Sequence, residues 1–90
     1  MVSPFSVEFT EKAAEEIGAV TKPVGQRLLD KIRWMADHFE AVTPAPLSGD
    51  LAGVSKLRVG DYRVLYTFNR DARSIRILRI CHRRDVYRNP

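Results

Sequence analysis

Apolar and polar residues alternate on both sides of Gly60-Asp61, which predicts a β-hairpin in the second half of the chain. A Gly-Asp pair between two such runs is typical of a two-residue turn, and glycine in first place favours type II′. This turn pairs Val59 with Tyr62 and Arg58 with Arg63. Since strand side chains alternate between faces, the hairpin places three cations on one face: Lys56, Arg58 and Arg63.

That face carries an energetic cost. Arg58 and Arg63 lie directly opposite each other in the predicted ladder, and like charges in such positions destabilise a sheet by up to about 1 kcal/mol. A compensating function is therefore expected, and an anionic ligand such as a phosphate group would supply one.

The first half of the chain predicts one strand and two helices. Residues 5–9 alternate as a strand does, and Thr10 is a good cap for a short helix that Gly18 can end. Thr21 can cap a second helix of about five turns. Its apolar residues recur at steps of three and four: Val24, Leu28, Ile32, Met35 and Phe39.

Two prolines and two glycines in residues 41–53 predict a loop, and strands are expected at about 54–59, 62–69 and 74–82. A turn at Asp71-Ala72 pairs Phe68 with Ile75, Tyr66 with Ile77, Val64 with Arg79 and Tyr62 with Cys81. In this register Arg79 is the charged exception on an apolar face, and His82 lies on the cationic face. The order of elements predicts an α+β fold: an N-terminal strand, a two-helix hairpin and a three-stranded antiparallel meander, with the helices on one face.

Composition sets the broad class. The 90 residues are enough for one domain, spanning 1–90. No apolar run is long enough to cross a bilayer, and the first residues lack the pattern of a signal peptide, so a cytoplasmic protein is expected. Cys81 has no partner for an internal disulfide, which fits a reducing compartment. His38 and His82 are too far apart in sequence to suggest a metal site, and no cofactor is expected.

Charge is unevenly distributed. The net charge is +4, but residues 54–90 hold ten Lys or Arg against three Asp, whereas residues 1–53 hold five basic and eight acidic residues. A basic half can be a solubilising surface or a nucleic-acid footprint. The gathering of three cations on one strand face favours the second interpretation.

The C-terminal segment adds further candidates beside the cationic face. A tyrosine among arginines suits stacking on a nucleobase while the cations bind phosphates. Tyr87 would fit the edge of the core equally well, and Arg84 and Arg88 are expected to contact RNA.

The same cluster lacks a carboxylate pair, so RNA cleavage would have to be metal-independent. The plausible route is attack by a 2′-hydroxyl on its own phosphate, which needs a base, an acid and fixed cations. Lys56 or His82 could transfer protons, while Arg58, Arg63 and Arg83 could stabilise the developing charge. Taken singly, Lys56 and Arg58 also fit a solvated strand face, and His82 fits a structural role.

The stretch 56–66, KLRVGDYRVLY, followed by ICHRRDVY at 80–87, resembles the RelE/ParE toxin superfamily. The segment Pro46-Leu-Ser-Gly49 and the helix pair before it agree with that resemblance, which covers nearly the whole chain. Within the superfamily the pattern is similar to the RelE branch. This implies a toxin that cleaves mRNA in the ribosomal A site and is neutralised by a cognate antitoxin.

The resemblance also implies roles for single residues. Lys56 matches a lysine that helps to activate the 2′-hydroxyl, and Arg63 an arginine that contacts the scissile phosphate. Arg83 matches a second phosphate-binding arginine, although the match can shift to Arg84, and Tyr87 matches a tyrosine that stacks on the base. Arg58 matches a further basic position. Some relatives carry another lysine where this chain has Val54, which leaves the identity of the base open between Lys56 and His82.

Two other functions agree with the same resemblance. One is a ParE-like toxin that inhibits DNA gyrase without nuclease chemistry. The other is an inactive member that serves as an antitoxin-binding module.

Overall fold

The computed structural model describes residues 4–47, 49 and 52–83. Its elements, in chain order, are β1 (Ser6–Phe9), α1 (Glu11–Ala19), α2 (Lys22–Asp37), the 3-10 helix η1 (Phe39–Ala41), β2 (Ala45–Pro46), β3 (Ser55–Val59), β4 (Tyr62–Asn69) and β5 (Ser74–His82).

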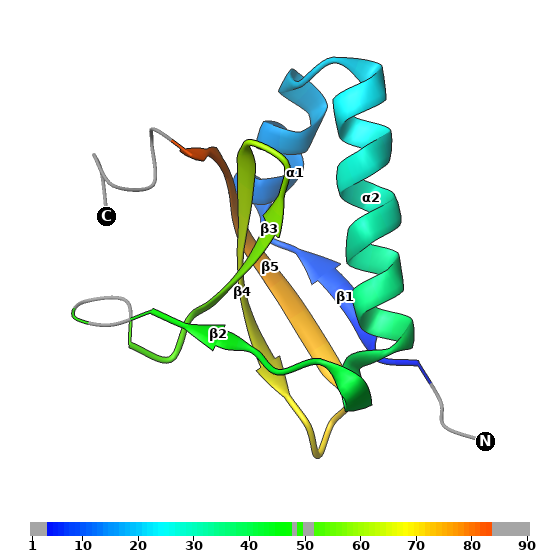
Figure 1. Ribbon diagram of the computed structural model, residues 1–90, viewed down its shortest axis with the longest axis vertical. Coiled ribbons are helices and arrows are strands. Elements are labelled where there is room, and N and C mark those ends of the chain that lie inside the picture. Colours follow the sequence, from blue (N-terminus) through cyan, green and yellow to red (C-terminus); the bar gives the residue numbers. More distant parts are fainter. Residues whose placement is uncertain (1–3, 48, 50–51, 84–90) are drawn as a thin grey trace.

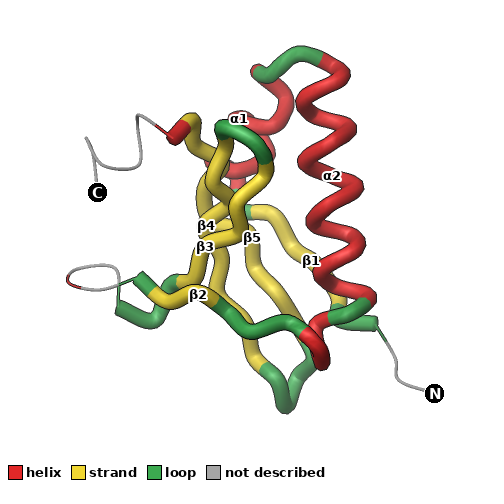
Figure 2. Tube along the Cα trace, viewed as in Figure 1, coloured by secondary structure: helices red, strands yellow, loops and turns green. Residues whose placement is uncertain are grey.

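The helices lie on one side of a five-stranded sheet with the order β1-β5-β4-β3-β2 (Figures 1 and 2). β1 runs parallel to β5, and the other neighbouring strands are antiparallel. The predicted α+β class and the order of its elements are confirmed. The expected loop at 41–53 is not wholly irregular, because it begins with the last residue of η1 and contains the short strand β2, which pairs with the start of β3.

Helix α1 begins as the sequence predicts. The Thr10 side chain caps it, with Oγ1 accepting a hydrogen bond from the Ala13 backbone N–H at 3.1 Å. The helix runs one residue past Gly18, to Ala19. Helix α2 follows Thr21, which holds the cap position but makes no capping hydrogen bond through its side chain. Pro23 lies in the first turn, where its missing N–H has no helical partner to lose.

The core lies between α2 and the sheet. Leu28, Ile32 and Met35 lie three and four residues apart on α2 and are buried against the strands. Phe39 continues this stripe and is also buried, although α2 ends at Asp37 and Phe39 belongs to η1. The sheet contributes its largest fully buried side chains to the same core: Val64, Tyr66, Ile75 and Ile77.

The β4–β5 ladder contains a β-bulge that the sequence reasoning did not predict. Phe68 pairs with Ile75 and Tyr66 with Ile77, as expected, but Leu65 then pairs with Arg79, which leaves Leu78 without a ladder partner on β4. One extra residue in a strand reverses the faces of all residues after it. The expected pairs of Val64 with Arg79 and of Tyr62 with Cys81 are therefore wrong: Val64 pairs with Ile80, and Tyr62 with His82.

The bulge removes the charged exception from the apolar face. Ile80 takes the core position opposite Val64, and Arg79 moves to the edge of β5 beside α1. There Glu16 accepts hydrogen bonds from Arg79 Nε and Nη2 at 2.9–3.1 Å, and from the backbone N–H of Ile80 at 2.8 Å. Because β1 pairs only as far as Ile77, this carboxylate satisfies a backbone donor that the neighbouring strand does not reach.

Candidate nucleic-acid interface

The β3–β4 hairpin has the geometry that its sequence predicts. Gly60 has a φ of +59°, whereas Asp61 is not among the residues with positive φ, which is the pattern of a type II′ turn. The register pairs Val59 with Tyr62, Arg58 with Arg63 and Lys56 with Leu65. The predicted pairing is confirmed in full, so Lys56, Arg58 and Arg63 share the sheet face opposite the helices. We call this surface the open face.

The three cations of the open face differ in exposure. Arg63 is only 8% exposed, and its Nη1 donates hydrogen bonds to the carbonyls of Tyr62 at 3.1 Å and Gly60 at 3.4 Å. These carbonyl dipoles hold the guanidinium at the turn and partly offset its repulsion from Arg58. Arg58 is exposed, and Lys56 is half-buried next to Ala45 of β2. The result is one fixed guanidinium flanked by two more accessible cations.

Arg83 lies at the same end of the sheet. Its backbone N–H donates to the Asp61 carbonyl at 2.6 Å, and its Nε lies 4.0 Å from Asp61 Oδ1. The exposed ion pair contributes little stability, but the backbone hydrogen bond ties Arg83 to the Gly60-Asp61 turn. Three basic residues thus lie at this turn, namely Arg58, Arg63 and Arg83, and Lys56 lies further along β3 on the open face.

His82 does not join them. The bulge places it opposite Tyr62, on the face that the helices cover, and the two rings meet edge to face with centroids 5.3 Å apart. The prediction that His82 lies on the cationic face is therefore wrong, and the reversal after Leu78 is the physical reason. Cys81 takes the open-face position opposite Arg63 and is buried.

Three predicted RNA-contacting residues, Arg84, Tyr87 and Arg88, lie outside the described residues. Among the residues that the structure does describe, no three His, Cys, Asp or Glu side chains gather as a metal site would require. In the same part of the chain, no helix is long and apolar enough to cross a membrane.

Sequence reasoning missed a groove between α2 and the turn. It has a volume of about 480 Å³, and Trp34, which is 47% exposed, lines it together with Arg27, Lys31 and Arg58. Lys31 Nζ lies 4.8 Å from the centre of the Trp34 ring, a cation–π distance. The signal in the sequence was an aromatic residue on the polar flank of an amphipathic helix, with cations at helical spacing.

Comparison with known proteins assigns the chain to a family. A family model described as "ParE toxin of type II toxin-antitoxin system, parDE" matches residues 7–87. The chain belongs to the RelE/ParE toxin superfamily. It is therefore a toxin of a type II toxin–antitoxin system, and the resemblance read from its motifs is confirmed at that level.

Individual relatives agree with this assignment. The chain is 28% identical over 85 residues to Toxin RelG of Mycobacterium tuberculosis, which covers 94% of this chain and 98% of that protein. The RelBE2 toxin–antitoxin complex of the same organism contains a chain that matches with a TM-score of 0.75 and 26% identity, over 90% of this chain and 100% of that one.

A more distant match supports the fold alone. A chain of the archaeal RelE–RelB complex of Pyrococcus horikoshii matches with a TM-score of 0.71 and 23% identity, over 90% of this chain and 97% of that chain.

Proposed function

We propose that this toxin is a ribosome-dependent endoribonuclease that cleaves mRNA in the A site. The observation that carries the proposal is the gathering of Lys56, Arg58 and Arg63 on the open face, next to Arg83. Three cations at one turn, with a fourth further along the same strand face, suit a phosphodiester whose charge increases in the transition state. The similarity to Toxin RelG agrees with the RelE branch on which this proposal rests.

In this mechanism the RNA supplies its own nucleophile. Lys56 Nζ takes the proton of a ribose 2′-hydroxyl, and the oxygen attacks the adjacent phosphorus. The bond from phosphorus to the 5′-oxygen of the next nucleotide breaks. That oxygen takes a proton from a solvent water, and Lys56 releases to solvent the proton that it took, so the base is regenerated. The products are a 2′,3′-cyclic phosphate and a 5′-hydroxyl, and no water or redox partner is consumed.

Arg63 and Arg83 have the complementary role of stabilising charge. Arg63 is held by two carbonyls at the turn, so little reorganisation is needed when the equatorial phosphate oxygens gain negative charge. Arg58 binds the RNA backbone from the exposed end of the same row. We assign proton transfer to Lys56 rather than His82, because the His82 ring contacts Tyr62 on the helix-covered face. Tyr87 is proposed to stack on the base, with Arg84 and Arg88 on flanking phosphates.

The ribosome has a defined part in this proposal. It holds the message in the geometry that in-line attack requires, which the isolated protein does not supply. Weak cleavage of free RNA is therefore expected even for an intact toxin.

A cognate antitoxin is the second proposed partner. The M. tuberculosis RelBE2 relative was solved as a toxin–antitoxin complex. The basic half of this chain favours an acidic partner. The cationic groove beside Trp34 offers such a partner an aromatic contact between positive charges.

Expression of the wild type and of Arg63→Ala, followed by primer extension on translated messages, tests the nuclease. We expect codon-phased cuts from the wild type and a loss of about 100-fold or more in the variant, since a fixed cation on the reacting phosphate is removed. Arg33→Ala, which removes an exposed arginine from α2, is the matched control and should cut normally. Melting temperatures of the purified variants separate lost chemistry from lost folding.

The description of the matching family as ParE favours a second candidate, inhibition of DNA gyrase. This function predicts growth arrest and a DNA-damage response while messages remain intact. Growth without arrest would instead indicate an antitoxin-binding module without toxicity. Either outcome would contradict the nuclease.

A further inference from the structure

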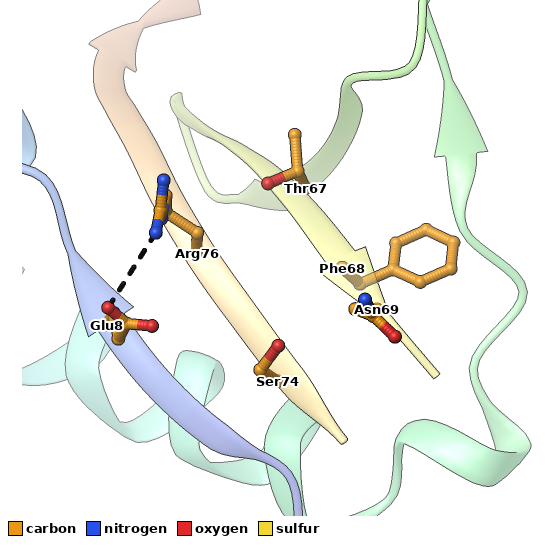
Figure 3. Close-up of a pocket in the computed structure, with 6 residues that line it drawn as sticks. All are labelled: Glu8, Thr67, Phe68, Asn69, Ser74 and Arg76. Carbon is orange, nitrogen blue, oxygen red and sulfur yellow. Dashed lines mark ion pairs between the residues drawn. The ribbon is translucent and has the colours of Figure 1, made fainter. Parts of the chain in front are cut away.

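A polar hollow lies on the open face, away from the Gly60-Asp61 turn. It has a volume of about 230 Å³ and is lined by residues of three neighbouring strands. Figure 3 shows the side chains of Glu8, Thr67, Ser74 and Arg76 above the sheet, with Asn69 at its end. These groups offer hydrogen-bond donors and acceptors of several kinds, which is the chemistry that a nucleotide requires.

Arg76 forms a longer ion pair than two neighbouring arginines, Arg73 and Arg79. Arg73 and Arg79 form short ion pairs of 2.6 and 2.9 Å with glutamates. Arg76 Nη2 lies 3.9 Å from Glu8 Oε2, and the two side chains are 60% and 62% exposed. A pair this long and this exposed contributes little to stability, so the guanidinium can change partners at small cost.

The hollow and the cationic turn share one strand face. Thr67 follows Arg63 by four residues on β4. Because the extra residue of the bulge belongs to β5 and not to β4, both side chains point away from the helices. Four residues of strand span about 13 Å. A stacked single strand rises about 3.4 Å per nucleotide, so the hollow lies a few nucleotides from a phosphate held by Arg63.

We propose that this hollow binds a flanking nucleotide of the same RNA whose phosphate is cleaved at the turn. Arg76 contacts that nucleotide, and the hydroxyls of Thr67 and Ser74 complete its hydrogen bonds. Glu8 repels phosphates and accepts hydrogen bonds from base amino groups, so the base rather than the backbone faces β1. The inference rests on the proposed nuclease function and extends its substrate along the sheet.

Binding of non-cleavable RNA tests the hollow without relying on activity. The probes are fluorescent 2′-O-methyl oligoribonucleotides of roughly two and roughly eight nucleotides, because a dinucleotide has a single internucleotide phosphate and is too short to occupy both Arg63 and Arg76. The wild type is expected to bind the longer probe about five- to tenfold more tightly, and Arg76→Gln should lose this preference. Arg70→Gln, which removes a nearby exposed charge that does not line the hollow, should retain it.

Each other result overturns the inference. The hollow is not an RNA site if the wild type shows no length preference or if Arg76→Gln keeps it. If Arg76→Gln and Arg70→Gln lose the preference for the longer probe equally, the net charge of the protein alone would explain the binding. The proposed function fails separately: intact messages in cells would refute cleavage even if Arg76-dependent binding is found, and Arg63-dependent cuts would stand even if Arg76 has no effect.

Discussion

The β3–β4 and β4–β5 hairpins share strand β4, yet only the first is a regular ladder. From Val59–Tyr62 to Ser55–Tyr66 every residue of β3 has one partner. The second ladder is regular from Asn69–Ser74 to Tyr66–Ile77, and then one residue, Leu78, is left over. The comparison shows that a single inserted residue decides which side chains of β5 reach the cationic face and which reach the core.

The largest expected effect on stability comes from placing a charge at position 80 of β5. Ile80 is buried opposite Val64 because of the bulge, so Ile80→Arg should destabilise the protein by about 4 kcal/mol, the order expected for an unpaired buried charge. Leu78→Arg is the control and should cost far less, since Leu78 is half-buried and unpaired. Chemical denaturation measures both.

A second substitution sharpens that test. The double variant combines Arg79→Ile with Ile80→Arg. If its β4–β5 ladder formed without the bulge, the new isoleucine would lie opposite Val64 in the core and the new arginine would lie on the open face. Part of the lost stability should therefore return, although Glu16 loses its partner. If the double variant is no more stable than Ile80→Arg alone, the sequence of β5 does not determine the bulge.

The link between the bulge and α1 predicts a smaller effect. Glu16→Ala removes the acceptor of two Arg79 nitrogens and of the Ile80 N–H, and should lower the free energy of unfolding by about 2 kcal/mol. Glu8→Ala breaks an exposed pair at 3.9 Å and should change it by less than about 0.5 kcal/mol. Equal effects in the two variants would show that Glu16 has no special role at the bulge.

The smallest expected effect on stability concerns Tyr66 in strand β4 of the regular hairpin. Burial raises the pKa of the Tyr66 phenol above its usual value of 10.0, while Arg70 and a hydrogen bond with Ser55 oppose that rise. Because the folded state holds the proton more tightly, stability should decrease as pH rises above about 10. Tyr66→Phe should lower the free energy of unfolding by about 1 kcal/mol at neutral pH. Its stability should also decrease less than that of the wild type as the pH rises above about 10. A decrease of the same size in both proteins would contradict this account.

Much of the fold follows from local signals in the sequence. The Gly60-Asp61 turn fixes a two-residue loop, and with it every pair of β3 and β4. The spacing from Leu28 to Met35 fixes the buried face of α2, and Phe39 continues that apolar stripe into η1. Strand β2 was missed because two residues that include a proline show no alternation.

The bulge left a signal that simple alternation passes over. Ile75 and Ile77 are followed by Leu78 and then Ile80, so the apolar phase changes by one residue where the bulge lies. A regular ladder was assumed because alternation alone does not say whether a phase change is a bulge or an exposed leucine. Regular alternation correctly places Lys56, Arg58 and Arg63, which depend only on the β3–β4 ladder, and misplaces His82, whose face depends on the extra residue in β5.

The proposed nuclease requires that its proton-transfer group, Lys56, lies on the open face of the β3–β4 hairpin. Mapping message cleavage by primer extension in Lys56→Gln and His82→Phe tests it most directly, since phenylalanine keeps a ring against Tyr62. We predict that Lys56→Gln lowers cleavage by about 100-fold or more, whereas His82→Phe stays within about twofold of the wild type. Cuts that persist in Lys56→Gln and disappear in a folded His82→Phe would contradict the claim.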